Sequence, residues 1–194
     1  MTYSELKTAI QDYLQNSETT FVTDLPTIIK QAEERILKLV RLPVFRKNVQ
    51  GNLTDGNQYL STPSDFMDTF SLATISSDTY NYLIRSDVSF IREAYPTSTT
   101  KGEPKHYALF DNSTYIIGPT PNADFNVELH YFYRPTSITA GSDSSTTWLS
   151  TNAINVLLYG CLLEGYTYMK GDADLMNLYK TRYDEALARL KILA

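Results

Sequence analysis

The spacing of apolar residues changes twice along this chain, and the change limits the folds that the chain can adopt. Apolar residues follow helical spacing over residues 3–41, alternate with polar residues through much of 44–135, and return to helical spacing from residue 153. One face of a helix repeats every 3.6 residues, whereas one face of a strand repeats every second residue. The pattern therefore predicts an α+β protein in which N- and C-terminal helices form a bundle that carries an antiparallel β-rich insertion, sandwich-like or barrel-like.

The first segment predicts two packed helices. Thr2 and Glu5 have the spacing of a capping box, and an apolar stripe follows, which indicates a helix over residues 3–15. A second stripe extends to Val40, before Pro43. We expect this helix over residues 24–41, with its N-cap at Thr23 or Asp24 and a proline, Pro26, in its first turn.

The middle segment predicts strands. Alternation begins at Phe45, the Asp55-Gly56 pair indicates a tight turn, and a return strand is expected to begin at Tyr59. Further strands are predicted at 66–75 and 80–84, as a hairpin at 107–110 and 115–117, and as a strand at 125–133. In the last of these strands only Phe132 breaks the alternation, because it falls on the polar face.

These patterns divide the chain into two predicted domains. Residues 1–43 and 148–194 are expected to form the helical bundle, and residues 44–136 the β-rich insertion. Residues 137–147, rich in Ser, Thr, Gly and Asp, are expected to form a flexible loop.

The helix predicted from residue 153 to 169 is apolar on nearly every side. A helix without a polar face must be covered on several sides, and we expect a chain of 194 residues to be too short to cover it alone. Together with 15 tyrosines, residues that suit protein contact surfaces, this predicts a subunit interface. The expected interface residues on this helix are Leu157, Leu158, Tyr159, Leu162 and Tyr166.

The charge of the chain argues against tight, non-specific binding of nucleic acid. The formal net charge is -5, and the basic residues are dispersed, whereas binding to phosphates needs clustered Lys and Arg. Arg41 and Arg46 belong to a small basic group near the end of the second helix. This group can serve the helix dipole or contact an acidic partner, and both interpretations stay open.

No motif with catalytic or cofactor chemistry is apparent, so we expect neither an enzyme, nor a cofactor, nor a metal site. The chain has one cysteine, Cys161, in an apolar helix, and two histidines far apart in sequence, His106 and His130. Its glycines form no phosphate-binding loop. Glu164, on the apolar helix, is expected to have a structural partner such as Lys170 or Arg182.

The first residues lack the basic start and apolar run of a signal peptide, and one cysteine cannot form an intramolecular disulfide. We therefore expect synthesis in a reducing cytosol and no membrane partner.

Several short motifs, taken in order, resemble the phage head-to-tail adaptor proteins. The central stretch 102–110 is similar to that family's G-x-P-x-x-Y-A pattern. A hairpin, Pro-x-Pro at 119–121 and then an alternating strand follow in the family's order. That strand ends in Tyr-Phe-Tyr-Arg-Pro at 131–135, which is similar to the family's Y-x-R-P. Trp148-Leu149 and the L-L-Y-G-x-L-x-E pattern at 157–164 continue the likeness. The two opening helices are similar too. Residues 60–66 resemble the family's L-P-x-D-F turn, although Ser61-Thr62 is inserted before the proline.

The resemblance implies a structural virion protein rather than an enzyme. It implies a homo-oligomeric ring, typically dodecameric, that docks on the portal protein on one side and on tail nozzle or tail fibre proteins on the other. Such a ring lines a DNA ejection channel, which double-stranded DNA passes without specific binding. The expected location is the neck or tail of the virion.

Two other functions are compatible with the residues. A phage-associated cell-wall hydrolase or carbohydrate-binding module would use the β-rich insertion, with an exposed aromatic platform and, for a hydrolase, a carboxylate pair. A different phage neck component, such as a tail-completion protein, would share the class but not the position.

Overall fold

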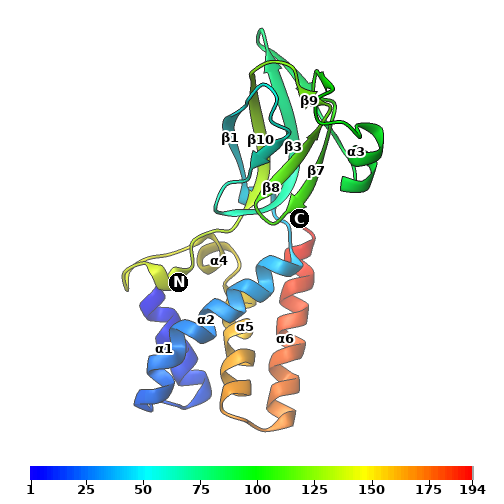
Figure 1. Cartoon of the computed structure of the whole chain (residues 1–194). Coiled ribbons are helices and arrows are strands. Elements are labelled where there is room, and N and C mark those ends of the chain that lie inside the picture. The colour runs from blue at the N-terminus through cyan, green and yellow to red at the C-terminus, as the bar shows by residue number, and fades with distance from the viewer. Residues whose placement is uncertain (194) are drawn as a thin grey trace. The chain divides into compact units, whose positions relative to one another are not determined.

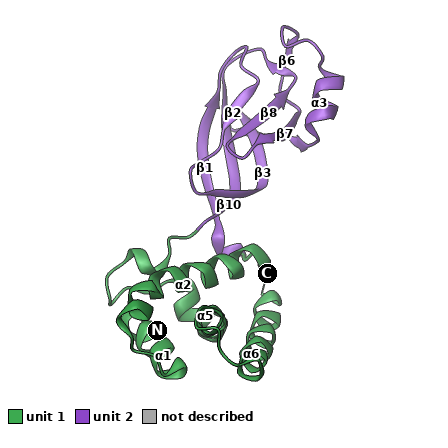
Figure 2. Cartoon of the chain, turned by 60° about the horizontal axis from the view of Figure 1, so that its bottom comes forward, with its two compact units in different colours: residues 1–42, 135–194 green, residues 43–134 purple. Residues whose placement is uncertain are grey.

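The computed structural model describes residues 1–193, which form two compact units. Unit 1 contains residues 1–42 and 135–194, and unit 2 contains residues 43–134 (Figure 2). Both ends of the chain thus contribute helices to unit 1, whereas the strands belong to unit 2 (Figure 1). The predicted α+β fold, helical ends with a β-rich insertion, is confirmed.

Helix α1 (Tyr3–Leu14) begins at the predicted capping box. The Glu5 N–H donates to Thr2 Oγ1 at 3.2 Å, and the Thr2 N–H donates to the Glu5 carboxylate at 2.8 Å. These two bonds satisfy N–H groups that a helix start leaves without partners. The apolar face of the helix, with Leu6 and Ile10, is buried.

Helix α2 (Thr19–Leu39) begins five residues earlier than predicted, and Pro26 lies inside it rather than in its first turn. The prediction missed this start because Pro26 lacks the N–H that would bond to Val22, a defect that usually costs about 3 kcal/mol. Phe21 and Leu25 are buried on the same side as Ile28 and Ile29. The burial of this longer apolar face offsets the lost hydrogen bond.

The C-terminal part of unit 1 contains three helices: α4 (Trp148–Asn152), α5 (Ile154–Tyr168) and α6 (Ala173–Lys191). Helix α5 is central, because α1, α2, α4 and α6 all pack against it. Figure 2 shows α5 end-on, with α1, α2 and α6 around it. The helices of unit 1 therefore bury its most apolar element among themselves.

The segment 137–147, which was expected to be a flexible loop, contacts α1 and α2 closely. It contains a short 3-10 helix, η2 (Ile138–Ala140), whose Ile138 side chain is buried. The Ile138 N–H donates to the Glu33 carboxylate at 3.1 Å. Farther along, the Tyr3 N–H donates to the carbonyl of Ser145, and Lys7 pairs with Asp143 at 2.6 Å. This segment thus packs on the helices of unit 1.

Unit 2 consists mainly of two four-stranded sheets. The first has the order β1-β10-β3-β4, with every neighbouring pair antiparallel, and its strands are β1 (Arg46–Leu53), β3 (Phe66–Ser76), β4 (Thr79–Tyr82) and β10 (Phe125–Tyr133). The second has the order β2-β8-β7-β5, with β2 (Tyr59–Ser61), β5 (Ile84–Arg85), β7 (His106–Asp111) and β8 (Thr114–Gly118). Smaller elements complete the unit: η1 (Pro43–Phe45), α3 (Val88–Ala94) and the strand pair β6 (Lys101–Gly102) and β9 (Thr120–Pro121).

The two sheets share one apolar core, as in a sandwich. Leu72 and Leu129 of the first sheet pack in the same cluster as Tyr107 and Tyr115 of the second. The hydroxyl groups of Tyr115 and Thr69 lie 2.6 Å apart in this core, so each buried hydroxyl has a partner. Burial raises the pKa of Tyr115, which keeps its hydroxyl protonated.

The predicted return strand after Asp55-Gly56 does not pair with β1. The turn forms, with Gly56 at a positive φ of 75°, but β1 pairs with β10 and β2 pairs with β8. The turn therefore carries the chain from one sheet to the other. Pairing with β10 extends over the whole length of β1, whereas β2 has only three residues to offer, so the longer antiparallel pairing is favoured.

Candidate interaction surfaces

Three of the predicted interface residues lie in the core of unit 1. Leu157 and Leu162 are fully buried, and Leu158 is nearly so. The interface prediction rested on the expectation that this chain is too short to cover α5, and the structure corrects that expectation. Four helices of the same chain cover α5, so these leucines need no second subunit to remove them from water.

The two tyrosines predicted on the same helix are only partly buried. The ring of Tyr166 packs edge-on against Tyr179 of α6, with 5.7 Å between ring centroids, and Tyr159 is half-buried. These tyrosines lie on a side of α5 that the other helices cover only in part, and they are partly exposed to solvent. They remain accessible to a partner, unlike the leucines beside them.

The structure separates the two arginines that the sequence grouped. The guanidinium of Arg41 donates to the carbonyl of Leu37 at 2.7 Å, so it satisfies the C-terminal end of α2. Arg46, in contrast, lies over two aromatic rings on unit 2. Its Cζ is 4.1 Å from the ring centroid of Phe70 and 5.0 Å from that of Phe132.

Arg46, Phe70, His130 and Phe132 form a cluster on the face of the first sheet that points away from the core; we call it the arginine–aromatic cluster. The Phe70 ring lies 4.8 Å from the His130 ring and 6.4 Å from the Phe132 ring, centroid to centroid. The side chain of Phe70 is 49% exposed. A cation over aromatic faces gains about 0.5–2 kcal/mol, so the cluster holds Arg46 at a partly exposed position.

A β-bulge places Phe70 in this cluster. Opposite Tyr131 and His130 of β10 stand Thr69 and Ser71 of β3, which leaves Phe70 between them without a partner. Because a bulge adds one residue to a strand, two consecutive side chains, here Phe70 and Ser71, can lie on the same face of the sheet. One sign of the cluster is visible in the sequence, because Phe132 falls on the polar face of its strand, but the bulge itself has no sequence signature here.

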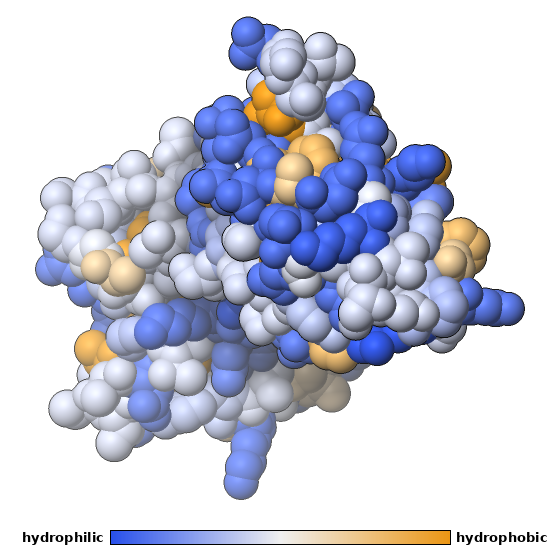
Figure 3. Space-filling model, turned by 45° about the horizontal axis from the view of Figure 1, so that its top comes forward, coloured by the Kyte–Doolittle hydropathy of each residue, from blue (hydrophilic) through white to orange (hydrophobic). Residues whose placement is uncertain are grey.

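Other large apolar side chains are exposed in small groups. On unit 2 they include residues of β4 and β5 as well as Tyr59 and Phe110, whose rings pack together beside Arg92. On unit 1 they include the α6 residues Leu175 and Leu178. Figure 3 shows small hydrophobic patches set among hydrophilic side chains on the face in view. Small, scattered groups of this kind are normal on protein surfaces and do not by themselves mark a binding site.

The two titratable residues that the sequence singled out on α5, Glu164 and Cys161, occupy structural positions. Glu164 pairs with Arg35 of α2 at 2.5 Å, not with the predicted Lys170 or Arg182. Arg182 pairs with Glu185 on its own helix instead. Burial, helped by the charges of Glu33 and Glu164, raises the pKa of the Cys161 thiol, which makes it a poor nucleophile.

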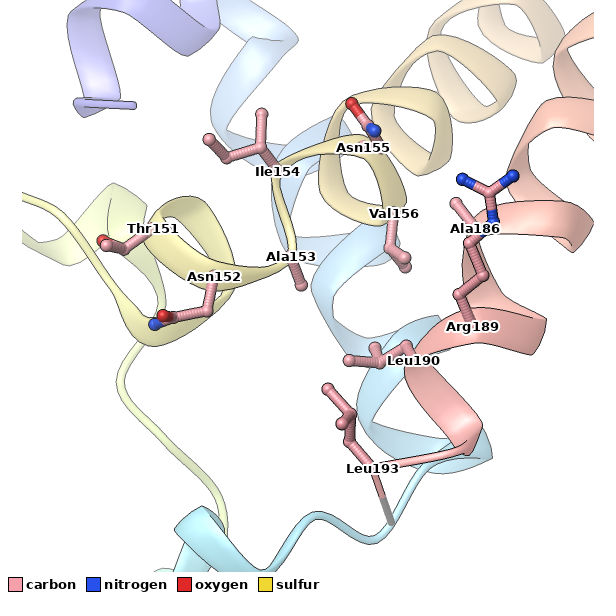
Figure 4. A pocket seen from close by; sticks show the side chains of 10 residues that line it. All are labelled: Thr151, Asn152, Ala153, Ile154, Asn155, Val156, Ala186, Arg189, Leu190 and Leu193. Carbon is pink, nitrogen blue, oxygen red and sulfur yellow. The ribbon is translucent and has the colours of Figure 1, made fainter.

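One pocket of unit 1 is a groove between the start of α5 and the end of α6 (Figure 4). It has a volume of about 380 Å³, and Figure 4 shows Leu190 and Leu193 of the C-terminal end facing Ala153 and Val156. Arg189 and Asn155 are among the few polar side chains that line it, and none of the lining residues within 1–193 has a carboxylate side chain. These side chains therefore provide no acid–base pair.

Residues 1–193 contain neither a cluster of metal ligands nor a membrane-spanning helix. No group of three or more His, Cys, Asp or Glu residues in that range is arranged to hold a metal ion. No helix within the same range is both long and apolar enough to cross a membrane.

Comparison with known families decides the class of the protein. The sequence model of the SU10 adaptor proteins matches residues 1–194. The chain belongs to this family of phage head-to-tail adaptors. No curated protein sequence matches it. The resemblance seen in the sequence motifs is confirmed, and the protein is a structural adaptor of a phage rather than a member of an enzyme family.

Proposed function

We propose that this protein assembles as a homo-oligomeric, dodecameric ring that joins the portal to the tail nozzle or tail fibre proteins and surrounds the DNA channel of the virion. The observation that carries the proposal is the family match over residues 1–194. It extends over both the helical unit and the β-rich unit, so each has a counterpart in adaptor proteins.

The surface chemistry supports a binding role. Exposed aromatic and aliphatic groups occur on both units, while Glu164 pairs with Arg35 and burial raises the pKa of the Cys161 thiol. A ring interface is stable when it removes such patches from water. The net charge of -5 repels phosphate, which suits a channel wall that DNA must pass without being held.

Arg46 is the predicted contact residue that best fits a partner surface. The arginine–aromatic cluster holds its guanidinium in place, and a preoriented, partly desolvated arginine binds carboxylates well. Arg41 is the matched comparison, because its guanidinium is engaged with the end of α2. We propose that an acidic segment of the portal or tail contacts Arg46.

The test is to mix the purified protein with portal rings and to observe the mixture by negative-stain microscopy and mass photometry. The expected result is extra density on the portal, with subunits added in the stoichiometry of the portal itself. A monomer in solution before mixing is compatible with the proposal. Absence of any association at micromolar concentrations would overturn it, and a cell-wall hydrolysis assay would then follow.

Two substitutions refine the same experiment. Arg46→Ala is expected to weaken binding to the portal or to the tail proteins, because it removes the cation that the cluster holds. Arg41→Ala is expected to leave binding unchanged. Equal binding by wild type and both variants would exclude the arginine–aromatic cluster as a contact while leaving the ring itself in place.

A further inference from the structure

The outer strand β1 is an open edge of the first sheet. Its only hydrogen-bonded neighbour among the strands is β10, so the backbone groups on its other side have no strand partner within residues 1–193 (Figure 1). Residues 47–52 of this strand are all exposed. An eight-residue edge of this kind is a ready template for another strand.

The features that usually block such an edge are missing from most of β1. The strand contains no proline, and its register with β10 runs without a bulge from Arg46 to Leu53. Its only charged residues, Arg46 and Lys47, stand at its start. Proteins that keep an edge unpaired place prolines, bulges or inward charges along it, so β1 is built to accept a partner.

The opposite edge of the same sheet, β4, has the complementary direction. Because β1, β10, β3 and β4 alternate in direction, β4 runs antiparallel to β1. If a second copy continues the sheet, its β4 meets β1 as an antiparallel neighbour, which is the pairing found throughout this sheet. Contact between two different edges is the head-to-tail kind from which rings are built.

The side chains along the two edges fit this pairing. The registers place Tyr80 in the same row as Asn52, and Tyr82 in the same row as Gln50, on one face of the sheet. Tyr80 and Tyr82 are 45% and 67% exposed. Tyrosine beside the amide side chains of a neighbouring strand buries its ring and finds partners for its hydroxyl.

On the core side of the sheet, β1 also has an apolar side chain that is only partly covered. Val49 pairs with the buried Leu129 and so lies on the core side of the sheet, yet 40% of its surface is exposed. Strand β2, at the edge of the facing sheet, has only three residues. A strand added beside β1 would cover this valine.

We propose that the subunits pair edge to edge, with β1 of one copy hydrogen-bonded to β4 of the next, so that the first sheets form one continuous antiparallel sheet around the ring. This inference rests on the proposed ring and adds its contact surface. The partner is thus a second copy of this chain, bound through main-chain hydrogen bonds and a row of tyrosines.

Cross-linking of rings assembled on the portal tests the pairing. Cysteine is introduced on β1 (Gln50→Cys), on β4 (Tyr82→Cys) or on both, and a short bis-maleimide is added; the native Cys161 is buried and serves as background in the wild type. The double variant is expected to give a ladder of cross-linked oligomers. Each single variant alone is expected to give none, and a mixture of the two single variants is expected to give dimers.

The outcomes separate this inference from the proposed function. No added density on the portal with wild-type protein would overturn the ring and the pairing together. Rings that form without a ladder from the double variant would overturn the pairing alone. Dimers from Gln50→Cys by itself would also overturn it, because they would indicate a two-fold contact between two β1 strands.

A charge placed on the edge gives an independent readout. Val49→Lys adds the kind of side chain that keeps edge strands apart, and we expect it to weaken ring assembly on the order of tenfold. Leu109→Lys is the matched control, because Leu109 is similarly exposed, at 38%, but lies on the inner strand β7. Assembly by Val49→Lys at the wild-type concentration, in mass photometry, would contradict the pairing.

Discussion

Helix α5 of unit 1 and strand β1 of unit 2 lead to opposite expectations about where this protein binds. Helix α5 is apolar on nearly every side, yet the other helices of its own unit cover it. Strand β1 is polar along most of its length, yet one side of its backbone has no strand partner within the described chain. Side-chain hydrophobicity therefore locates the core of unit 1, whereas unmet backbone hydrogen bonding locates the open surface of unit 2.

The largest effect is expected from the core of unit 1. Leu157→Ala should lower the free energy of unfolding by about 2–5 kcal/mol, because it leaves a cavity at a fully buried position. Urea unfolding followed by the fluorescence of Trp148, the single tryptophan, reports on this unit directly. Tyr13→Ala, at an exposed position on α1, is the control. If monomeric Leu157→Ala is as stable as the wild-type monomer, Leu157 does not stabilise the core and is again a candidate for the subunit interface.

A smaller effect is expected in the core of unit 2. Tyr115→Phe removes one member of the buried hydroxyl pair with Thr69, and we expect a loss of about 1–2 kcal/mol, because the remaining hydroxyl is left without a partner. Hydrogen exchange of peptides from β3 and β8 measures it. Tyr80→Phe, at the exposed β4 edge, should leave exchange in the monomer unchanged. Equal protection from hydrogen exchange in Tyr115→Phe and wild type would show that the hydroxyl pair does not contribute to the stability of unit 2.

The arginine–aromatic cluster is expected to contribute less than the core. Arg46→Ala should lower the stability of unit 2 by about 0.5–1 kcal/mol, the usual size of a partly exposed cation–π contact. The measurement is hydrogen exchange of β1 and β10, with Arg92→Ala beside Phe110 as a comparison. A loss of several kcal/mol would mean that Arg46 serves the fold rather than a partner.

The smallest effect on the free energy of unfolding is expected from Glu33. The direction in which this effect changes with pH tests the pKa of its carboxyl group. Burial raises the pKa of this carboxyl above its ordinary value of 4.5, although hydrogen bonds from Ser137 and the Ile138 N–H oppose the shift. The folded state therefore holds the proton more tightly, so the stability from this group is fully present below pH 4.5 and is lost as the pH rises through the folded pKa.

Glu33→Gln should remove that dependence on pH and make unit 1 relatively more stable than the wild type at neutral pH. The measurement is the difference in Trp148-monitored unfolding between variant and wild type from pH 4 to 8. Glu34→Gln, one residue along on the exposed side of α2, is the control. A difference that does not change with pH would show that Glu33 titrates as an ordinary carboxyl.

The sequence by itself determined the α+β class, the capping box of α1, the strand at 125–133 and the likeness to head-to-tail adaptors. These follow from local spacing, because a side chain one turn or two residues away decides which face is buried. The sequence also showed Arg46 as part of a small basic group and, separately, Phe132 on the polar face of its strand.

The tertiary structure decided what depends on distant partners. It decided that α5 is covered within its own unit, that Pro26 is tolerated inside α2, and that β1 pairs with β10 and not with β2. It also placed Phe70 beside Arg46 through a bulge, and Arg35 beside Glu164. The physical reason is common to all of them: each outcome is set by packing and hydrogen bonds between segments far apart in sequence, which no local pattern records.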